Sequence, residues 1–179
     1  QPKTPPKYLL IWLCQTKTTN NWAIFIDLLV FQKVQVYDIF WELLIICPSN
    51  PFISIDPILK LPGLKKAIEN SQICVLAVSP IVGGQALKGP TAKMLKELRL
   101  KSDASSIAQH YGEILDGFVI DTKDRNLEKQ ISEKGHKVLV TQTIMKSLDD
   151  KVSLANDILD FAAEISLWTV TVTTSNALL

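Results

Sequence analysis

Four short apolar runs, separated by stretches with helical patterns, most restrict the folds open to this chain. The runs cover residues 43–47, 73–79, 117–121 and 137–141. Apolar strands that alternate with helices are typical of βαβ units, whose strands form a mainly parallel sheet. The pattern therefore predicts an α/β domain with a Rossmann-like, mainly parallel sheet flanked by helices. Residues 1–44 show no such alternation, so we expect the sheet to be incomplete at the N-terminus.

The stretches between and after these strands have patterns typical of helices, whereas the tail of the chain has the alternating pattern of a strand. Residues 167–179 alternate like a strand, and we expect them to form either an edge strand or a disordered end. The other stretches have apolar residues at a 3.6-residue period, glycine at their ends or capping sequences at their starts. We expect helices that end near Asn70, open at Pro90, cover 107–115 and about 125–134, and begin again at 147–150.

Polar residues follow each of the four strands. In a parallel sheet the carboxyl ends of the strands lie along one edge, and ligands bind in the crevice outside that edge. The loops that converge there are Ser49-Asn50, Ser79 to Lys88, Asp121 to Asp124 and Thr141 to Thr143. The sequence therefore predicts a binding site at this edge.

The loop SPIVGGQALKGP has features of a phosphate site. Adjacent glycines permit positive φ and close backbone approach, and successive amides can form an anion nest. Pro90 opens a helix whose N-terminus favours anions. A flexible surface loop is the alternative, and the sequence matches neither the P-loop nor the dinucleotide-binding glycine pattern. The candidate nucleotide- or phosphate-binding residues here are Ser79, Gly83, Gly84, Lys88 and Gly89.

The loop PSNPFISIDP and the carboxylates after the third strand add further candidates. Ser49, Asn50 and Ser54 can donate hydrogen bonds to a ligand, or they can satisfy an Asx-turn of their own backbone. Asp121 is an additional polar candidate, whereas we expect Asp124 to be the N-cap of the next helix.

Several other residue types have ordinary structural interpretations. The two histidines, His110 and His136, have no companion pattern and are expected to be structural. The basic residues Lys93, Lys96, Arg99 and Lys101 have the spacing of a solvated helix face. The three cysteines, Cys14, Cys47 and Cys74, lie far apart in apolar stretches, and we expect buried free thiols in a reducing cytoplasm. The net charge of +1 gives no reason to expect nucleic-acid binding. The N-terminal apolar runs are shorter than the roughly 20 residues of a membrane span.

Taken together, the segments CPSNPFISIDPILKLPGLKKAIE, VLAVSPIVGGQALKGPTAKML, AQHYGEILDGFVIDTKD and LANDILDFA resemble the 2-phospho-L-lactate transferase family. The resemblance covers residues 47–161, as the C-terminal half of a family member. It implies a cytoplasmic enzyme of coenzyme F-420 biosynthesis. Such an enzyme moves a 2-phospholactyl or phosphoenolpyruvyl group from a guanosine diphosphate-linked donor to the deazaflavin Fo, and releases GMP. The resemblance also implies Mg²⁺ as cofactor and leaves a homodimer open as the assembly.

The N-terminal part departs from this family, whose members begin with a glycine-rich strand–loop–helix and carry aspartates there for the metal and the deazaflavin. No glycine precedes Gly63. We therefore divide a single domain into an atypical segment 1–44, a transferase-like core 45–165 and a tail 166–179. We expect little activity from the chain alone. Two alternatives stay open: a non-catalytic nucleotide- or sugar-nucleotide-binding regulatory protein of the same fold, and an inactive remnant.

Overall fold

The computed structural model describes residues 8–11, 43–71, 73–87 and 89–176. Most of the segment 1–44, with Cys14, lies outside the described residues, and so do Lys88 and residues 177–179. The predictions made for these residues therefore stay predictions.

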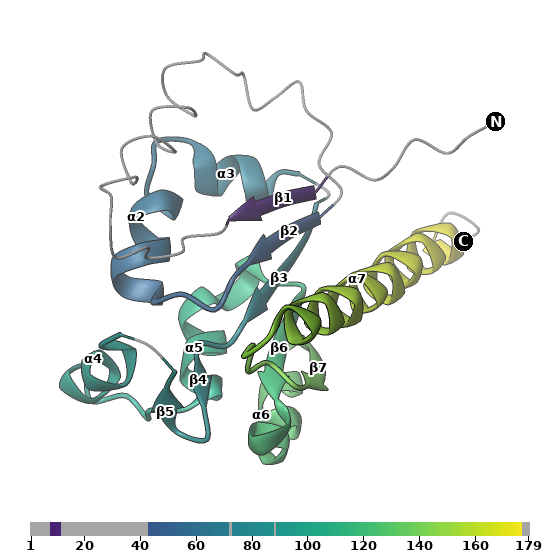
Figure 1. The fold of residues 1–179 in the computed structure, drawn as a ribbon. Helices are drawn as coiled ribbons and strands as arrows, with labels where there is room; N and C mark the ends of the chain where they lie inside the picture. The colour runs from purple at the N-terminus through teal and green to yellow at the C-terminus, as the bar shows by residue number, and fades with distance from the viewer. Residues whose placement is uncertain (1–7, 12–42, 72, 88, 177–179) are drawn as a thin grey trace.

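A five-stranded parallel sheet in the order β1-β2-β3-β6-β7 forms the centre of the described fold (Figure 1). Its last four strands are those predicted from the apolar runs. The five strands are β1 (Tyr8–Ile11), β2 (Leu43–Ile46), β3 (Cys74–Val78), β6 (Gly117–Asp121) and β7 (Lys137–Thr141). Each neighbouring pair is parallel, so the α/β fold expected from the sequence is confirmed.

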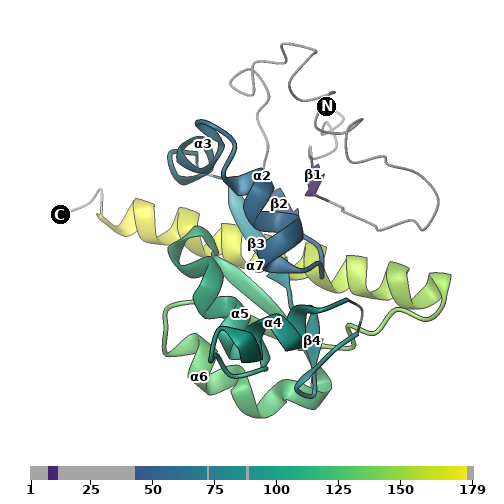
Figure 2. The same cartoon turned by 90° about the vertical axis from the view of Figure 1, so that its left-hand side faces the viewer.

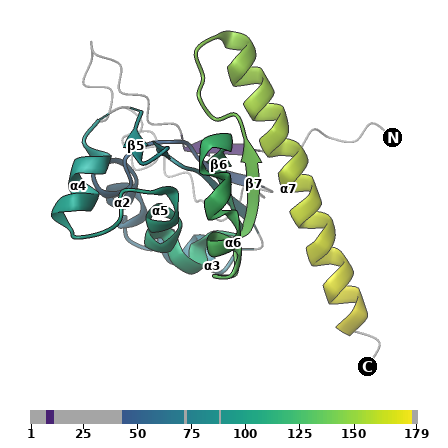
Figure 3. The ribbon, with the colours of Figure 1, turned by 90° about the horizontal axis from the view of Figure 1, so that it is seen from below.

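Helices cover both faces of the sheet (Figure 2). The long helix α7 lies along one face, and the shorter helices lie on the other (Figure 3). No helix within the described residues is long and apolar enough to cross a membrane. The helices are α2 (Asp56–Leu59), α3 (Leu64–Glu69), α4 (Thr91–Glu97), α5 (Ala104–Tyr111), α6 (Glu128–Ser132) and α7 (Leu148–Asn176). Short π- and 3₁₀-helical turns cover Pro51–Ile55, Gly112–Ile114 and Thr122–Leu127, and a small hairpin joins β4 (Ile81–Val82) to β5 (Gln85–Ala86).

Alternation along the strands divides the interior into two apolar cores. Successive side chains of a strand point to opposite faces of the sheet. On β2, Leu44 and Ile46 therefore belong to the core shared with α5, whereas Leu43 and Ile45 belong to the core shared with α7. Because both faces are covered, every residue of β2, β3 and β6 is buried. This is why these strands read as continuous apolar runs in the sequence.

Gly117 marks a close approach between the sheet and α7. A Cβ atom at this position would lie 2.7 Å from Leu76 Cδ2 and 2.8 Å from both Ile165 Cδ1 and Phe161 Cε1. Side chains of β3 and α7 thus occupy the space that any larger residue at the start of β6 would need. Glycine at this position is a packing requirement.

Three predicted elements differ from the structure. Residues 167–176 continue α7 as a helix, so the strand-like interpretation of the tail is wrong for them. The physical reason is that extending a formed helix costs far less than starting a new element, and a short alternating pattern does not outweigh that. The helix predicted at about 125–134 is instead a 3₁₀ turn, Thr122–Leu127, followed by α6. The period over 107–115 breaks at Gly112, which has φ of 59° and ends α5.

Candidate functional site

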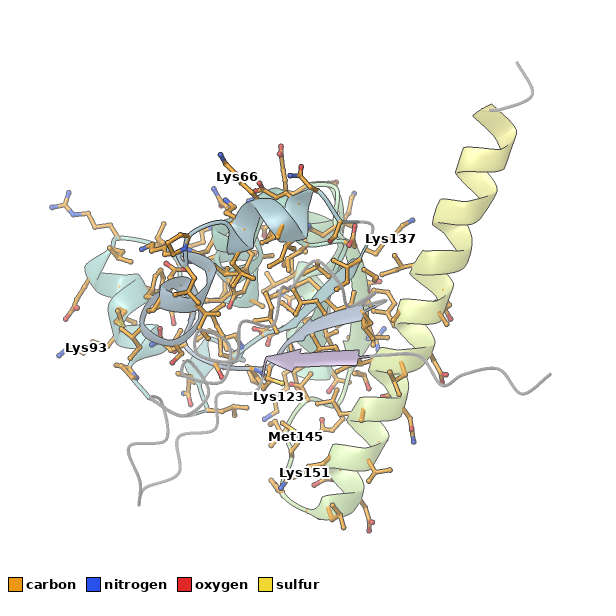
Figure 4. All side chains as sticks on the ribbon, turned by 90° about the horizontal axis from the view of Figure 1, so that it is seen from above. Lys66, Lys93, Lys123, Lys137, Met145 and Lys151 are labelled. Atoms are coloured by element: carbon orange, nitrogen blue, oxygen red, sulfur yellow. The ribbon has the colours of Figure 1, made fainter. Side chains whose placement is uncertain are left out.

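The loops that follow β3, β6 and β7 emerge at the carboxyl edge of the sheet and are tied to one another. The strand order places β6 between β3 and β7, so its loop can contact both neighbours. Two carboxylates of that loop, Asp121 and Asp124, make these contacts. Figure 4 shows Lys123 and Met145, from the loops after β6 and β7, toward the same end of the molecule and away from Lys66.

Asp121 joins the loop after β6 to the loop after β7. Its Oδ2 accepts hydrogen bonds from Thr143 N at 3.0 Å and Thr143 Oγ1 at 3.1 Å. Its Oδ1 accepts from Lys123 N at 3.0 Å and from Thr122 Oγ1 at 3.4 Å. The side chain is fully buried. Burial alone would raise the pKa of Asp121, but these donors stabilise the carboxylate and hold its pKa below the usual value. Asp121 is therefore an ionised, fully hydrogen-bonded anchor.

Asp124 joins the loop after β6 to the loop after β3. Gly83 N donates to Asp124 Oδ2 at 3.0 Å and to Asp124 Oδ1 at 3.1 Å. Burial raises the pKa of Asp124; the Gly83 amide offsets this in part, and Asp121 and Asp103 raise the pKa further. The prediction that Asp124 is an N-cap is wrong, because Asp121 caps the 3₁₀ turn by accepting from Lys123 N. The turn starts directly after the strand, so the cap falls three residues earlier than expected.

The two adjacent glycines form the tip of the β4–β5 hairpin. Gly83 has φ of 57° and Gly84 has φ of 77°, the left-handed values that a two-residue hairpin turn of this kind requires. Ser102 Oγ donates to Gly84 O at 3.0 Å. The Ser79 side chain, fully buried at the foot of the hairpin, bonds the backbone of Ile81 through both its donor and its acceptor. The loop is thus an ordered turn at the sheet edge, not an irregular surface loop.

The loop after β2 adopts the capping arrangement that the sequence left open. Asn50 Oδ1 accepts from Phe52 N at 2.9 Å and from Ile53 N at 3.2 Å, so its side chain caps the π-helical turn. Its Nδ2 donates to Met94 Sδ at 3.5 Å, which ties this loop to α4. Ser49 is partly buried and has interactions of its own. Ser54 is also partly buried, and its amide donates to Asn50 O.

Comparison with known proteins identifies the family of the chain. The family model described as 2-phospho-L-lactate transferase CofD matches residues 41–157, more than half of the chain. The chain belongs to the 2-phospho-L-lactate transferase CofD family. The matched range contains every described candidate residue of the site, from Ser49 to Asp121, and the two loop contacts made by Asp121 and Asp124.

Individual curated relatives are named 2-phospho-L-lactate transferase or phosphoenolpyruvate transferase. The chain is 43% identical over 124 residues to a 2-phospho-L-lactate transferase of Methanocaldococcus jannaschii, covering 69% of this chain and 38% of the relative. It is 35% identical over 158 residues to that of Methanococcus maripaludis strain C5, covering 76% and 50%. A phosphoenolpyruvate transferase of Streptomyces griseus is 32% identical over 125 residues, covering 69% and 39%. The chain thus spans half or less of the length of these curated relatives.

The described part of this CofD-family chain does not by itself offer a metal site. No group of three or more His, Cys, Asp or Glu residues that could hold a metal ion exists among the described residues. Asp121 already accepts four hydrogen bonds from the protein. The described residues therefore do not form a complete set of metal ligands by themselves, and Mg²⁺ stays a prediction.

The histidines of the CofD-family chain have the structural roles expected, while the cysteines and the basic residues meet their predictions only in part: Cys74 is buried but Cys47 is half-buried. His110 Nε2 lies 2.8 Å from Asp56 Oδ1 and holds α2 to α5, and buried His136 contacts Leu115 O. Cys47 and Cys74 are free, and burial raises the pKa of Cys47 to about 11 and, with Asp116, that of Cys74 to about 12. Both thiols therefore stay protonated near neutrality. The basic residues Lys93, Lys96, Arg99 and Lys101 are all exposed, but only Lys93 and Lys96 lie on α4. The predicted helix face is wrong for Arg99 and Lys101, because α4 ends at Glu97 and Arg99 has φ of 57°.

Sequence analysis did not identify Asp124 as a site residue. It gave Ser79 as a phosphate-binding candidate, whereas in the structure the Ser79 side chain bonds the backbone of Ile81. Asp124 contacts a glycine 41 positions away, and no local pattern signals that contact. Ser79 is engaged with Ile81 inside the fold. Gly89, just before α4, has φ of 72°, and its role in phosphate binding stays a prediction.

Proposed function

We propose that the carboxyl edge of this sheet binds the diphosphate of a guanosine diphosphate-linked donor, and that the protein is a transferase of the kind its relatives are named for. In the reaction the acceptor hydroxyl oxygen of the deazaflavin Fo forms a bond to the phosphorus that carries the acid. The bond from that phosphorus to the bridging oxygen breaks, its electron pair leaves with GMP, and the hydroxyl proton is lost. The group transferred is 2-phospholactate or phosphoenolpyruvate, since relatives of both names match.

One observation carries the proposal. The loops after β3, β6 and β7 are held together at one edge by Asp121 and Asp124, within the region that matches the family. This is the edge at which parallel α/β sheets bind ligands. Transfer at a diphosphate depends mainly on positioning the reactants and on stabilising charge on the phosphate oxygens. The backbone amides of an ordered glycine turn can donate hydrogen bonds to phosphate oxygens, with no charged side chain needed for these contacts.

Four parts of the proposal rest on the family resemblance. No ligands for Mg²⁺ are assigned among the described residues, and we derive no step through it. Fo as acceptor, the cytoplasmic location and a homodimer likewise stay predictions.

The experiment is a GMP-release assay with Fo, donor and Mg²⁺. It compares the 179-residue chain with a chimera that places the N-terminal part of the Methanocaldococcus jannaschii relative before residue 43. We expect little release from the chain alone and clear release from the chimera, with lactyl and enolpyruvyl donors tested separately. A chimera that folds and binds Fo but releases no GMP from either donor would contradict the proposed activity.

A further inference from the structure

We propose that Asp124 is a positioning residue for donor binding: it fixes the Gly83–Gly84 turn so that the Gly84 N–H faces the donor diphosphate. The proposal rests on the proposed function, and it assigns different roles to the two glycines. The Gly83 amide is used inside the protein, and the Gly84 amide is left for the ligand.

The position of the turn is determined from two sides. Asp124 is only 4% exposed and receives the Gly83 N–H at 3.0 and 3.1 Å. On the other side, Ser102 Oγ donates to the Gly84 carbonyl at 3.0 Å. A hairpin of only two-residue strands has little stability of its own. The two contacts therefore supply the order that the hairpin itself lacks.

The orientation of the turn leaves one amide unused. Among the described residues, the Gly84 N–H has no protein acceptor, whereas its neighbour Gly83 is bonded to Asp124. Both glycines are exposed. Backbone amides in left-handed conformations are donors that anions use. Within the described part of this turn, the Gly84 N–H is thus a free, exposed donor at the carboxyl edge.

Asp124 has two separable effects on donor binding: it accepts the Gly83 N–H, and it carries a negative charge when ionised. The charged groups that face it are Asp121 and Asp103, which disfavour its ionised form, and Lys123, which favours it. A diphosphate at Gly84 would add a further negative charge nearby. The hydrogen-bond acceptor of Asp124 therefore favours donor binding by ordering the turn, whereas its negative charge disfavours donor binding. An asparagine keeps the acceptor for Gly83 N–H and removes the charge, whereas an alanine removes both.

The test is calorimetric titration of the 179-residue chain with GDP, for three variants beside the unsubstituted protein. Asp124→Ala should weaken binding by roughly tenfold, the scale of one lost hydrogen bond. Asp124→Asn should bind as tightly as the unsubstituted chain or more tightly. The matched control is Asp116→Ala. Asp116 Oδ2 accepts the amide of Val75, also 41 positions earlier, at the opposite end of β3 and β6. It should lower stability and leave GDP affinity unchanged.

A second variant covers the case in which Asp124→Ala does not fold. Ser102→Ala removes the exposed contact on the other side of the turn, and it should weaken GDP binding several-fold with little change in melting temperature. Equal GDP affinity in Asp124→Ala, or in Ser102→Ala if the former is unfolded, would overturn the inference and leave the proposed function standing. Loss of affinity in Asp124→Asn equal to that in Asp124→Ala would also overturn it. No GDP binding by the unsubstituted chain would overturn the proposed function, and the inference with it.

Discussion

Asp121 accepts both hydrogen bonds that Thr143 can donate to it, from the backbone N–H at 3.0 Å and from Oγ1 at 3.1 Å. The contact spans 22 positions and closes the loop after β7 onto the end of β6. A buried carboxylate of this kind is stable only while its donors stay in place. The Asp121 side chain therefore both holds the loops together at the carboxyl edge and contributes to the stability of the fold.

Replacing this carboxylate by its amide tests the link. Asp121→Asn puts an NH₂ group where donors already point, and hydrogen bonds to a charged acceptor are worth about 1.5–3 kcal/mol. We expect the free energy of unfolding to fall by about 2–3 kcal/mol in urea denaturation. Asp160→Asn, an exposed site on α7, is the matched control and should change it by less than about 0.5 kcal/mol. Equal stability of the two variants would show that Asp121 does not hold the edge together.

The opposite pKa shifts of Asp121 and Asp124 predict opposite effects of acidification on the stability of the fold. The pKa of Asp124 is raised, so the folded state binds its proton first, and stability should rise as pH falls through that raised value. The pKa of Asp121 is lowered, so its contribution is complete above the unfolded value of about 3.9 and is lost as pH falls further.

Denaturation at a series of pH values separates these effects. Asp124→Asn should remove the rise on acidification and keep the loss below about pH 4. A stability profile that is identical in Asp124→Asn and the unsubstituted protein would contradict the raised pKa of Asp124.

The packing at Gly117 gives a third prediction. Gly117→Ala would place a methyl group against Leu76, Phe161 and Ile165 and should destabilise the fold by about 1–3 kcal/mol, as overpacking does. Because Ile165 is one of the obstructing side chains, Ile165→Ala should relieve part of this cost in the double variant. Thermal denaturation of the four proteins in the cycle measures the coupling. Additive effects would mean that α7 does not pack against Gly117 as closely as described.

Lys88 lies outside the described residues, so its role remains a prediction from the sequence. Lys88→Ala should weaken GDP binding by about 1.5–3 kcal/mol through loss of a charge-assisted phosphate contact. Lys93→Ala is the control, because Lys93 is exposed on α4 and pairs with Glu97 at the surface. The same calorimetric affinity in both variants would show that Lys88 is merely solvated.

The sequence predicted the sheet well and the site contacts poorly, for physical reasons. Strands buried on both faces leave continuous apolar runs, so β2, β3 and β6 could be placed. The short apolar run of β7 could be placed too, although this strand is only partly buried, and the carboxyl edge followed from the four strands. The capping role of Asn50 could be stated only as one of two alternatives, because an Asx-turn and a ligand site use the same residue types. The pairing of Gly83 with Asp124 has no local signal at all, since it depends on which loops the folded sheet brings together.

The measurement that tests the account most directly is a GDP titration of the ¹⁵N-labelled chain followed by amide chemical shifts. The account predicts that the shifts change in the loops after the strands, at residues 49–54, 79–89, 121–124 and 141–143. The largest change is expected at Gly84, and little change at the opposite edge around Asp116 and Lys137. No saturable change, or changes centred on the edge at Asp116 and Lys137, would contradict a nucleotide site at the carboxyl edge of this sheet.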